Sequence, residues 1–110
     1  MKRRVFIKSG SGEFVQMLPG VKRKTLTFAE KTLSIEIFLD KGSKVPPHSH
    51  INEQTGYMIY GKAVLNIGGE TYNVEPGDAW TIPSDVEHSL EVIEDSKIIE
   101  IFSPMREEYI

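Results

Sequence analysis

Two of the three histidines of this chain lie in residues 42–61, GSKVPPHSHINEQTGYMIYG. His48 and His50 are two residues apart, so in an extended segment both imidazoles point to the same face and can share one metal ion. Gln54 follows just ahead of an apolar run, and His88 lies further along the chain. Three imidazoles and an amide oxygen that converge would suit a divalent transition metal.

The pattern around this segment predicts an all-β fold. Short β-branched runs separated by glycine, proline and aspartate recur roughly every ten residues, the spacing of a sandwich or barrel. The clearest strand is 32–40, in which alternate residues from Leu33 to Leu39 form one apolar face. Gly68-Gly69 predicts a tight hairpin between 62–67 and 70–74, because glycine adopts positive φ angles readily. Further strands are expected at 22–28, 55–60, 78–82, 87–94 and 97–102. A closed barrel or jelly roll would hide the edges of so many short strands.

Composition excludes several classes of function. The chain has 110 residues, 39% of them apolar, which is enough for the core of one domain but not of two. Its 13 basic and 16 acidic residues give a net charge of -3, without the positive charge that nucleic-acid binding requires. It has no cysteine, which excludes disulfides, thiolate-ligated zinc and a cysteine nucleophile. The chemistry must therefore come from histidines, carboxylates and hydroxyls.

The chain shows no targeting or membrane segment. No run approaches the roughly 20 apolar residues of a membrane span. The apolar run that follows the basic N-terminus is too short for the core of a signal peptide. We therefore expect a cytoplasmic protein without a membrane partner.

A second group of chemical residues lies near the C-terminus. Glu100 and Phe102 share one face of the strand expected at 97–102, and isoleucines occupy the other face. If the Glu100 face is inward, a carboxylate and an aromatic ring enter the same cavity as the metal, and Arg106 can reach the mouth of that cavity. Burial would then raise the pKa of Glu100, and a nearby cation would oppose that shift. If the face is outward, Glu100 is a solvent-facing residue and Arg106 a charge of the tail.

Two spacings in the chain resemble the two motifs of the cupin family: Gly42-x5-His48-x-His50-x3-Gln54-x6-Gly61 and Gly77-x5-Pro83-x4-His88. The resemblance implies a single-domain, double-stranded β-helix barrel, also called a jelly roll. It also implies one divalent transition metal per chain, such as Mn, Fe, Ni or Zn. The implied ligands are His48, His50, Gln54 and His88.

The chain departs from the common cupin motifs at two positions. Gln54 stands where glutamate is usual, and Asp85 stands where the second motif usually has glycine. An amide in place of a carboxylate leaves the metal site about one charge more positive, which favours an anionic ligand. Glu53 is the neighbouring carboxylate, but on an extended strand it faces away from Gln54.

A narrower resemblance covers about residues 20–110. The segments 21–26, 48–61 and 101–109 are similar to those of the pectin-degradation cupins of the KdgF group. In that group an acid, a phenylalanine and an arginine act beside the metal on unsaturated uronate monosaccharides and promote their conversion to a linear keto form. The matching catalytic positions are Glu100, Phe102 and Arg106, with Glu100 in place of the usual aspartate.

Several functions remain open on this reading. The first is a metal-dependent enzyme acting on a small sugar acid, with Arg106 pairing with the substrate carboxylate and Glu100 moving a proton. The second is a cupin that binds a sugar or another anion without catalysis, which the Glu100 departure favours. The third is an iron or manganese dioxygenase, and the last is an isomerase or epimerase of another sugar. Fold alone does not choose among them.

We expect two parts in the chain, an N-terminal strand segment at 1–20 and the cupin domain at 21–110. The first part contains five apolar residues that suit a strand added to the sheet of a partner, which predicts a homodimer. These residues are Phe6, Phe14, Val15, Met17 and Leu18. The alternative is that they pack on their own barrel.

Overall fold

The computed structural model describes residues 3–110 and is almost entirely β-structure. A short 3-10 turn, η1 (Glu107–Tyr109), ends the chain. Among the described residues no helix is long and apolar enough to cross a bilayer. The strands are Phe14–Leu18 (β1), Val21–Phe28 (β2), Leu33–Leu39 (β3), Lys44–His48 (β4), Glu53–Ile67 (β5), Glu70–Val74 (β6), Ala79–Ile82 (β7) and His88–Ser103 (β8). The all-β prediction is confirmed.

Two long strands, β5 and β8, form the centre of the fold. The sequence predicted two strands in place of each, at 55–60 and 62–67 and at 87–94 and 97–102. In the structure each pair is one bent strand, and β5 and β8 pair antiparallel along their length with register shifts between Met58 and Ala63. A bend accompanied by bulges changes the direction of a strand without ending its pairing. Local turn signals therefore predicted ends that do not exist.

Gly61 makes this bend possible. Its φ is +109°, a conformation that side chains disfavour, and a Cβ there would lie 2.1 Å from Ser96 Oγ and 2.6 Å from the carbonyl oxygen of Asp95. The two strands can therefore approach this closely only because position 61 has no side chain. Close packing therefore explains why the residue that ends the first cupin spacing is a glycine.

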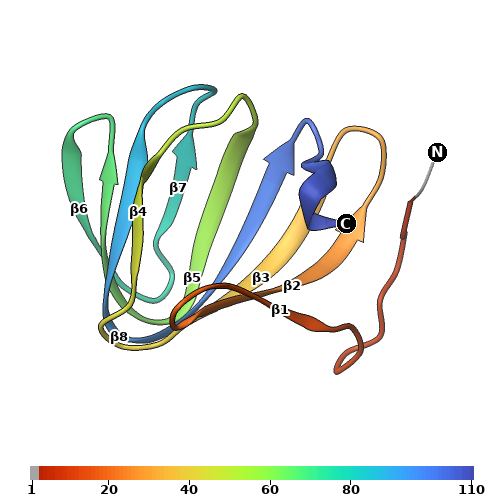
Figure 1. The fold of residues 1–110 in the computed structure, drawn as a ribbon, viewed down its shortest axis with the longest axis horizontal. Helices are drawn as coiled ribbons and strands as arrows, with labels where there is room; N and C mark the ends of the chain where they lie inside the picture. The colour runs from red at the N-terminus through yellow and green to blue at the C-terminus, as the bar shows by residue number, and fades with distance from the viewer. Residues whose placement is uncertain (1–2) are drawn as a thin grey trace.

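The eight strands form one continuous hydrogen-bonded network, which the bend folds into two facing sheets, as in a jelly roll. The first half of β8 pairs with β4 and the second half of β5 pairs with β6. The other halves pair with β3 and β7, and β2 and β1 continue the sheet beyond β3. Figure 1 shows β4 and β6 gathered at one end of the molecule and β1, β2 and β3 at the other.

The core lies between these sheets. In β3 the residues Leu33, Ile35, Ile37 and Leu39 are buried and alternate with partly exposed residues, as the sequence predicted. The hairpin between β5 and β6 is also confirmed, with φ values of +58° at Gly68 and +90° at Gly69. Strand β4 was not among the expected strands. It matters because it holds His48 against β8.

Part of the N-terminal segment packs on its own barrel, and part of it stays exposed as a partner-binding strand would. Strand β1 pairs with β2 of the same chain, and Met17 and Leu18 pack against the core. Phe6, Phe14 and Val15 stay exposed to solvent. The homodimer, and the role of residues 1–20 in it, remain predictions.

Candidate functional site

The fold brings the three histidines together. His48 at the end of β4 is the register partner of His88 at the start of β8, and their ring centroids are 4.2 Å apart. His50 lies in the loop between β4 and β5, with its ring 5.6 Å from His48 and 4.9 Å from His88. The possible ligand atoms of the three side chains all lie within 4.8 Å of one another. This histidine cluster can hold one metal ion, as the spacing predicted.

Backbone carbonyls orient all three imidazoles. The Nδ1 atoms of His48, His50 and His88 lie 2.9 Å from carbonyl oxygens two residues away in sequence, those of Pro46, Asn52 and Val86. A carbonyl only accepts, so each Nδ1 carries the proton and each Nε2 keeps a lone pair. The Nε2 atoms of His50 and His88 are buried and have no hydrogen-bond partner. Imidazoles held in this way are typical of metal ligands.

The protonation of the cluster also suits a metal. Burial lowers the pKa of His88 to about 4. Burial and, to a smaller extent, the charge of Arg106 also lower the pKa of His50. Both imidazoles are therefore neutral near pH 7, which is the form that binds metal ions.

Gln54 connects the histidine cluster to the acid. Its side chain on β5 is only 5% exposed, and its amide nitrogen donates a hydrogen bond to Glu100 Oε2. The amide group is planar, so the Gln54 side-chain oxygen points away from the amide nitrogen that donates to Glu100. The Gln54 side chain is also close enough to His50 to affect the pKa of that imidazole. Gln54 as a metal ligand remains a prediction. Glu53 is exposed and faces away, as expected.

Glu100 faces the interior, which settles the question that the strand pattern left open. It is 7% exposed, and Ile98 and Phe102 on the same face of β8 are also buried, whereas Ile101 is 44% exposed. Burial raises the pKa of Glu100 to about 7, although the hydrogen bond from Gln54 and the charge of Arg106 oppose this shift. The carboxyl group is therefore present in both protonation states near neutral pH.

Arg106 lies between β8 and η1, and its side chain is only 15% exposed. The guanidinium carbon is 5.4 Å from the centroid of the Phe102 ring. The same guanidinium is held by Glu108 and Tyr109 of η1. Arg106 is thus part of the interior site rather than a free charge of the tail.

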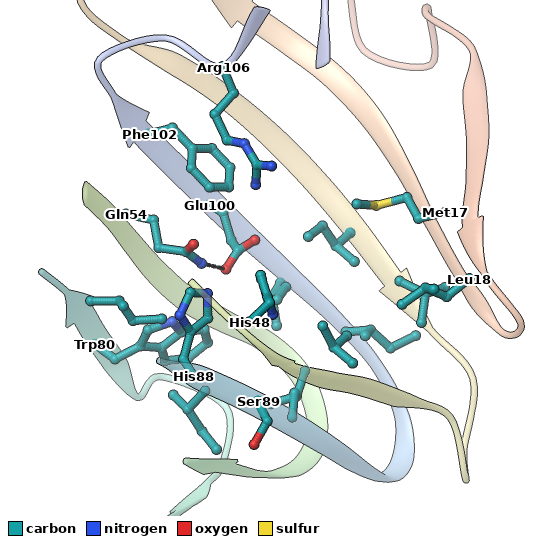
Figure 2. Close-up of a pocket in the computed structure, with 18 of the residues that line it drawn as sticks. Met17, Leu18, His48, Gln54, Trp80, His88, Ser89, Glu100, Phe102 and Arg106 are labelled. Carbon is teal, nitrogen blue, oxygen red and sulfur yellow. Dashed lines mark hydrogen bonds between the residues drawn. The ribbon is translucent and has the colours of Figure 1, made fainter. Parts of the chain in front are cut away.

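Except for His50, all these groups line one cavity between the sheets. Figure 2 shows Gln54, Glu100, Phe102 and Arg106 along one wall, with His48, His88 and Trp80 next to Gln54. Apolar residues, including Met17 and Leu18 at the end of β1, line the opposite side of the cavity. The cavity therefore combines a place for a metal ion, an acid with a raised pKa, and a cation.

Two residues that support the site, Asn52 and Tyr109, have no role that the sequence pattern predicted. Asn52 is 8% exposed and donates from Nδ2 to the carbonyl of Pro104 at 2.6 Å, while its own carbonyl accepts the Nδ1 proton of His50. It thereby joins the loop of His50 to the segment that carries Arg106. A polar residue between two predicted ligands was the only signal in the sequence, because its partner lies far away along the chain.

Comparison with known proteins gives the class of this protein. A family model described as "Cupin domain" matches residues 35–103, which is more than half of the chain. The chain therefore belongs to the cupin family.

Particular relatives cover nearly the whole chain. The pectin degradation protein KdgF of Dickeya dadantii (strain 3937) is 29% identical over 110 residues, covering 98% of this chain and 99% of the relative. The structure of KdgF from Halomonas sp. has 28% identity and a TM-score of 0.91, covering 97% of this chain and 99% of that one. An RmlC-like cupin from Shewanella frigidimarina NCIMB 400 has 27% identity and a TM-score of 0.95, with both chains fully covered.

Proposed function

We propose that this cupin is a metal-dependent enzyme that converts unsaturated monouronates to their linear keto forms. The observation that carries the proposal is a buried Glu100, with a pKa of about 7, between a three-histidine cluster and Arg106. The similarity to KdgF from two organisms, over almost the full length of each chain, supports the substrate class.

The residues fit the needs of this reaction. An unsaturated monouronate has a carboxylate next to a ring double bond and a hemiacetal on the other side of the ring oxygen. Opening the ring breaks the bond between the hemiacetal carbon and the ring oxygen. The hemiacetal hydroxyl loses a proton, a double-bond carbon gains one, and the ring oxygen becomes the keto oxygen. The reaction is an isomerisation, so it needs no oxidant or reductant.

Glu100 is the residue that we assign to the proton transfers. With a pKa of about 7, it is present in both forms at neutral pH, so it can take one proton and deliver the other. Arg106 pairs with the substrate carboxylate, and the Phe102 ring beside it forms an apolar wall that keeps water from the reacting atoms.

The metal would be held by His48, His50 and His88, with Gln54 as the fourth ligand. When bound, it supplies a Lewis acid that polarises an oxygen of the substrate. The chain itself orients the imidazoles through their Nδ1 bonds and, through burial, keeps His50 and His88 neutral.

The test is an assay of the metal-loaded protein with unsaturated galacturonate and mannuronate monomers. Turnover is followed as loss of the ultraviolet absorbance of the conjugated double bond. We expect Glu100→Gln to lower kcat by about 10²- to 10⁴-fold, because it removes the titrating group and keeps the shape. The matched control is Glu91→Gln, at an exposed position of the same strand, which should leave kcat unchanged.

Two outcomes would contradict the proposal. Equal kcat values for the wild-type protein and Glu100→Gln would remove Glu100 from the reaction. If the wild-type protein binds these uronates but does not turn them over, the protein is a sugar-acid-binding cupin.

A further inference from the structure

Arg106 has donors that its neighbours in the chain do not use. Its Nε and Nη2 atoms lie 2.8 Å and 2.7 Å from Glu108 Oε1, so one edge of the guanidinium faces that carboxylate. Nη1 donates to the phenolic oxygen of Tyr109 at 3.0 Å. A guanidinium has five N–H groups, and these contacts take three at most. At least two N–H groups remain for a ligand.

Tyr109 places a second donor beside them. Arginine can only donate, so the phenolic oxygen accepts the bond from Arg106 and does not use its own proton in it. Tyr109 lines the same cavity as Glu100 and Phe102, and its ring lies edge-on to that of Phe102 with centroids 5.6 Å apart. Burial raises the pKa of the Tyr109 phenol, so this group keeps its proton at neutral pH.

Strand β2 holds Tyr109 in this place. The guanidinium carbons of Arg23 and Arg106 lie 4.5 Å and 4.3 Å from the centroid of the Tyr109 ring. Thr25 Oγ1 donates to the carbonyl of Tyr109, and Arg23 Nη2 donates to the carbonyl of Glu108 at 3.2 Å. Arg23 and Thr25 belong to segment 21–26, which resembles that of the KdgF group but had no predicted role. The structure gives that segment a role, because it anchors the C-terminal turn.

We propose that Tyr109 is a further substrate-binding residue, whose hydroxyl group and the free N–H groups of Arg106 together bind the substrate carboxylate, and that Arg23 is the positioning residue for Tyr109. This inference rests on the anionic substrate of the proposed function and names the group that recognises its charge. The guanidinium groups of Arg23 and Arg106 both pack on the Tyr109 ring, and Arg106 also donates to the Tyr109 hydroxyl, so positive charge lies beside this donor and attracts an anion. One carboxylate oxygen accepts from Arg106 and the other from Tyr109.

The experiment compares a sugar acid with its neutral counterpart. Binding of D-galacturonate and of D-galactose to the metal-loaded protein is measured by calorimetry for the wild type and for Tyr109→Phe. The variant keeps the ring that packs on Arg106, Arg23 and Phe102 and loses only the hydroxyl. We expect about tenfold weaker binding of galacturonate, the usual cost of a hydrogen bond to a charged group, and no change for galactose or for metal affinity.

The matched control is Tyr57→Phe, which removes a hydroxyl from an exposed tyrosine of β5. It should leave both sugars unaffected. Equal galacturonate affinity in the wild type and Tyr109→Phe would overturn the proposal. So would a wild-type protein that does not prefer galacturonate to galactose.

A double variant tests the role of Arg23. Arg23→Met keeps an unbranched apolar stem and removes the charge and the donors, so Tyr109 loses one of its two anchors on β2 and keeps the bond from Thr25. If Arg23 acts through Tyr109, Arg23→Met weakens galacturonate binding, and the double variant with Tyr109→Phe binds no more weakly than Tyr109→Phe alone. Additive losses would show that Arg23 acts on the ligand by another route.

The result for Tyr109 can be separated from the result of the test for uronate turnover. If the wild type turns over unsaturated uronates and Tyr109→Phe has the same KM, the enzyme proposal stands and this inference fails. If Tyr109→Phe weakens uronate binding in a protein without turnover, this inference stands and the enzyme proposal fails. Under both proposals Tyr109→Phe raises KM and leaves kcat nearly unchanged, because the carboxylate is bound equally in ground and transition states.

Discussion

Two members of the histidine cluster, His48 and His88, line the same cavity as the C-terminal cluster of Glu100, Arg106 and Tyr109, but the two clusters are supported in different ways. Each histidine donates to a carbonyl only two residues away in sequence. The C-terminal cluster depends instead on distant partners: Gln54 for Glu100, and Arg23 and Thr25 for η1. The first cluster is therefore oriented by its own short segments. The second exists only once β2, β5 and β8 have come together.

Burial also shifts the pKa values of the two clusters in opposite directions. Burial lowers the pKa of His88 and raises that of Glu100, because it disfavours the charged form of either group. At neutral pH His50 and His88 are therefore neutral, whereas Glu100 is close to half-protonated. The same cavity thus has the neutral imidazole of His88 at one end and a carboxyl group with a pKa near 7 at the other.

Removal of a histidine is expected to have the largest effect. His88→Ala should weaken metal binding by more than about 100-fold, because even the loss of a group that only orients a ligand costs 10- to 100-fold. Metal affinity is measured by competition with a chelator. Glu100→Gln is the comparison variant and should retain metal. An equal loss in both variants would mean that the two clusters are one unit.

The bend that joins the clusters is the next place to test. Gly61→Ala should lower the free energy of unfolding by about 3 kcal/mol, because the new Cβ adopts a disfavoured φ and meets Ser96 and the backbone of Asp95. Gly77→Ala is the matched control, since its φ is +92° but the space around it is open. It should cost about 1 kcal/mol. Denaturant unfolding measures both, and equal costs would show that close packing at the bend is unimportant.

The pH dependence of stability distinguishes the acid from the histidines. The pKa of Glu100 is raised from 4.5 to about 7 in the folded state, so its contribution to stability is fully present below pH 4.5 and is lost as the pH rises through 7. Between pH 5 and 7 this loss amounts to about 2 kcal/mol. The contribution of His88 has the opposite sign, being present above pH 6.5 and lost as the pH falls through about 4.

Metal-free wild-type protein and Glu100→Gln are therefore compared by denaturant unfolding across this range. Relative to the variant, the wild type should lose about 2 kcal/mol as the pH rises from 5 to 7. Glu53→Gln, at an exposed position, should follow the wild type. Parallel curves for the wild type and Glu100→Gln would show that burial does not raise the pKa of Glu100.

The smallest expected effect comes from replacing the planar guanidinium of Arg106 with an ammonium group. Arg106→Lys keeps the positive charge and loses the planar set of donors that a carboxylate fits, so galacturonate binding should weaken by about tenfold. Metal affinity should be unchanged, because the histidine cluster does not use Arg106 for support. Calorimetry with metal and with galacturonate measures the two separately. A larger loss of metal than of galacturonate would reverse the assignment.

Local patterns in the sequence predicted much of this protein. The alternation from Leu33 to Leu39 predicted the buried face of β3, and Gly68-Gly69 predicted a hairpin that is present. The spacing of the histidines predicted a cluster that the fold assembles. These features could be read in advance because they depend on the period of a strand, the freedom of glycine and the chemistry of single side chains.

Only the tertiary structure decided how the strands join and which way β8 faces. Turn signals near Gly61 and Asp95 predicted strand ends, but long-range pairing of β5 with β8 carries both strands through a bend. The alternation along β8 offered two faces, and packing of Phe102 into the core chose the one that buries Glu100. The place of Arg106 depends on Arg23 and Thr25 through Tyr109 and Glu108. No short segment contains these contacts, because their energy comes from residues that meet only after the sheets have assembled.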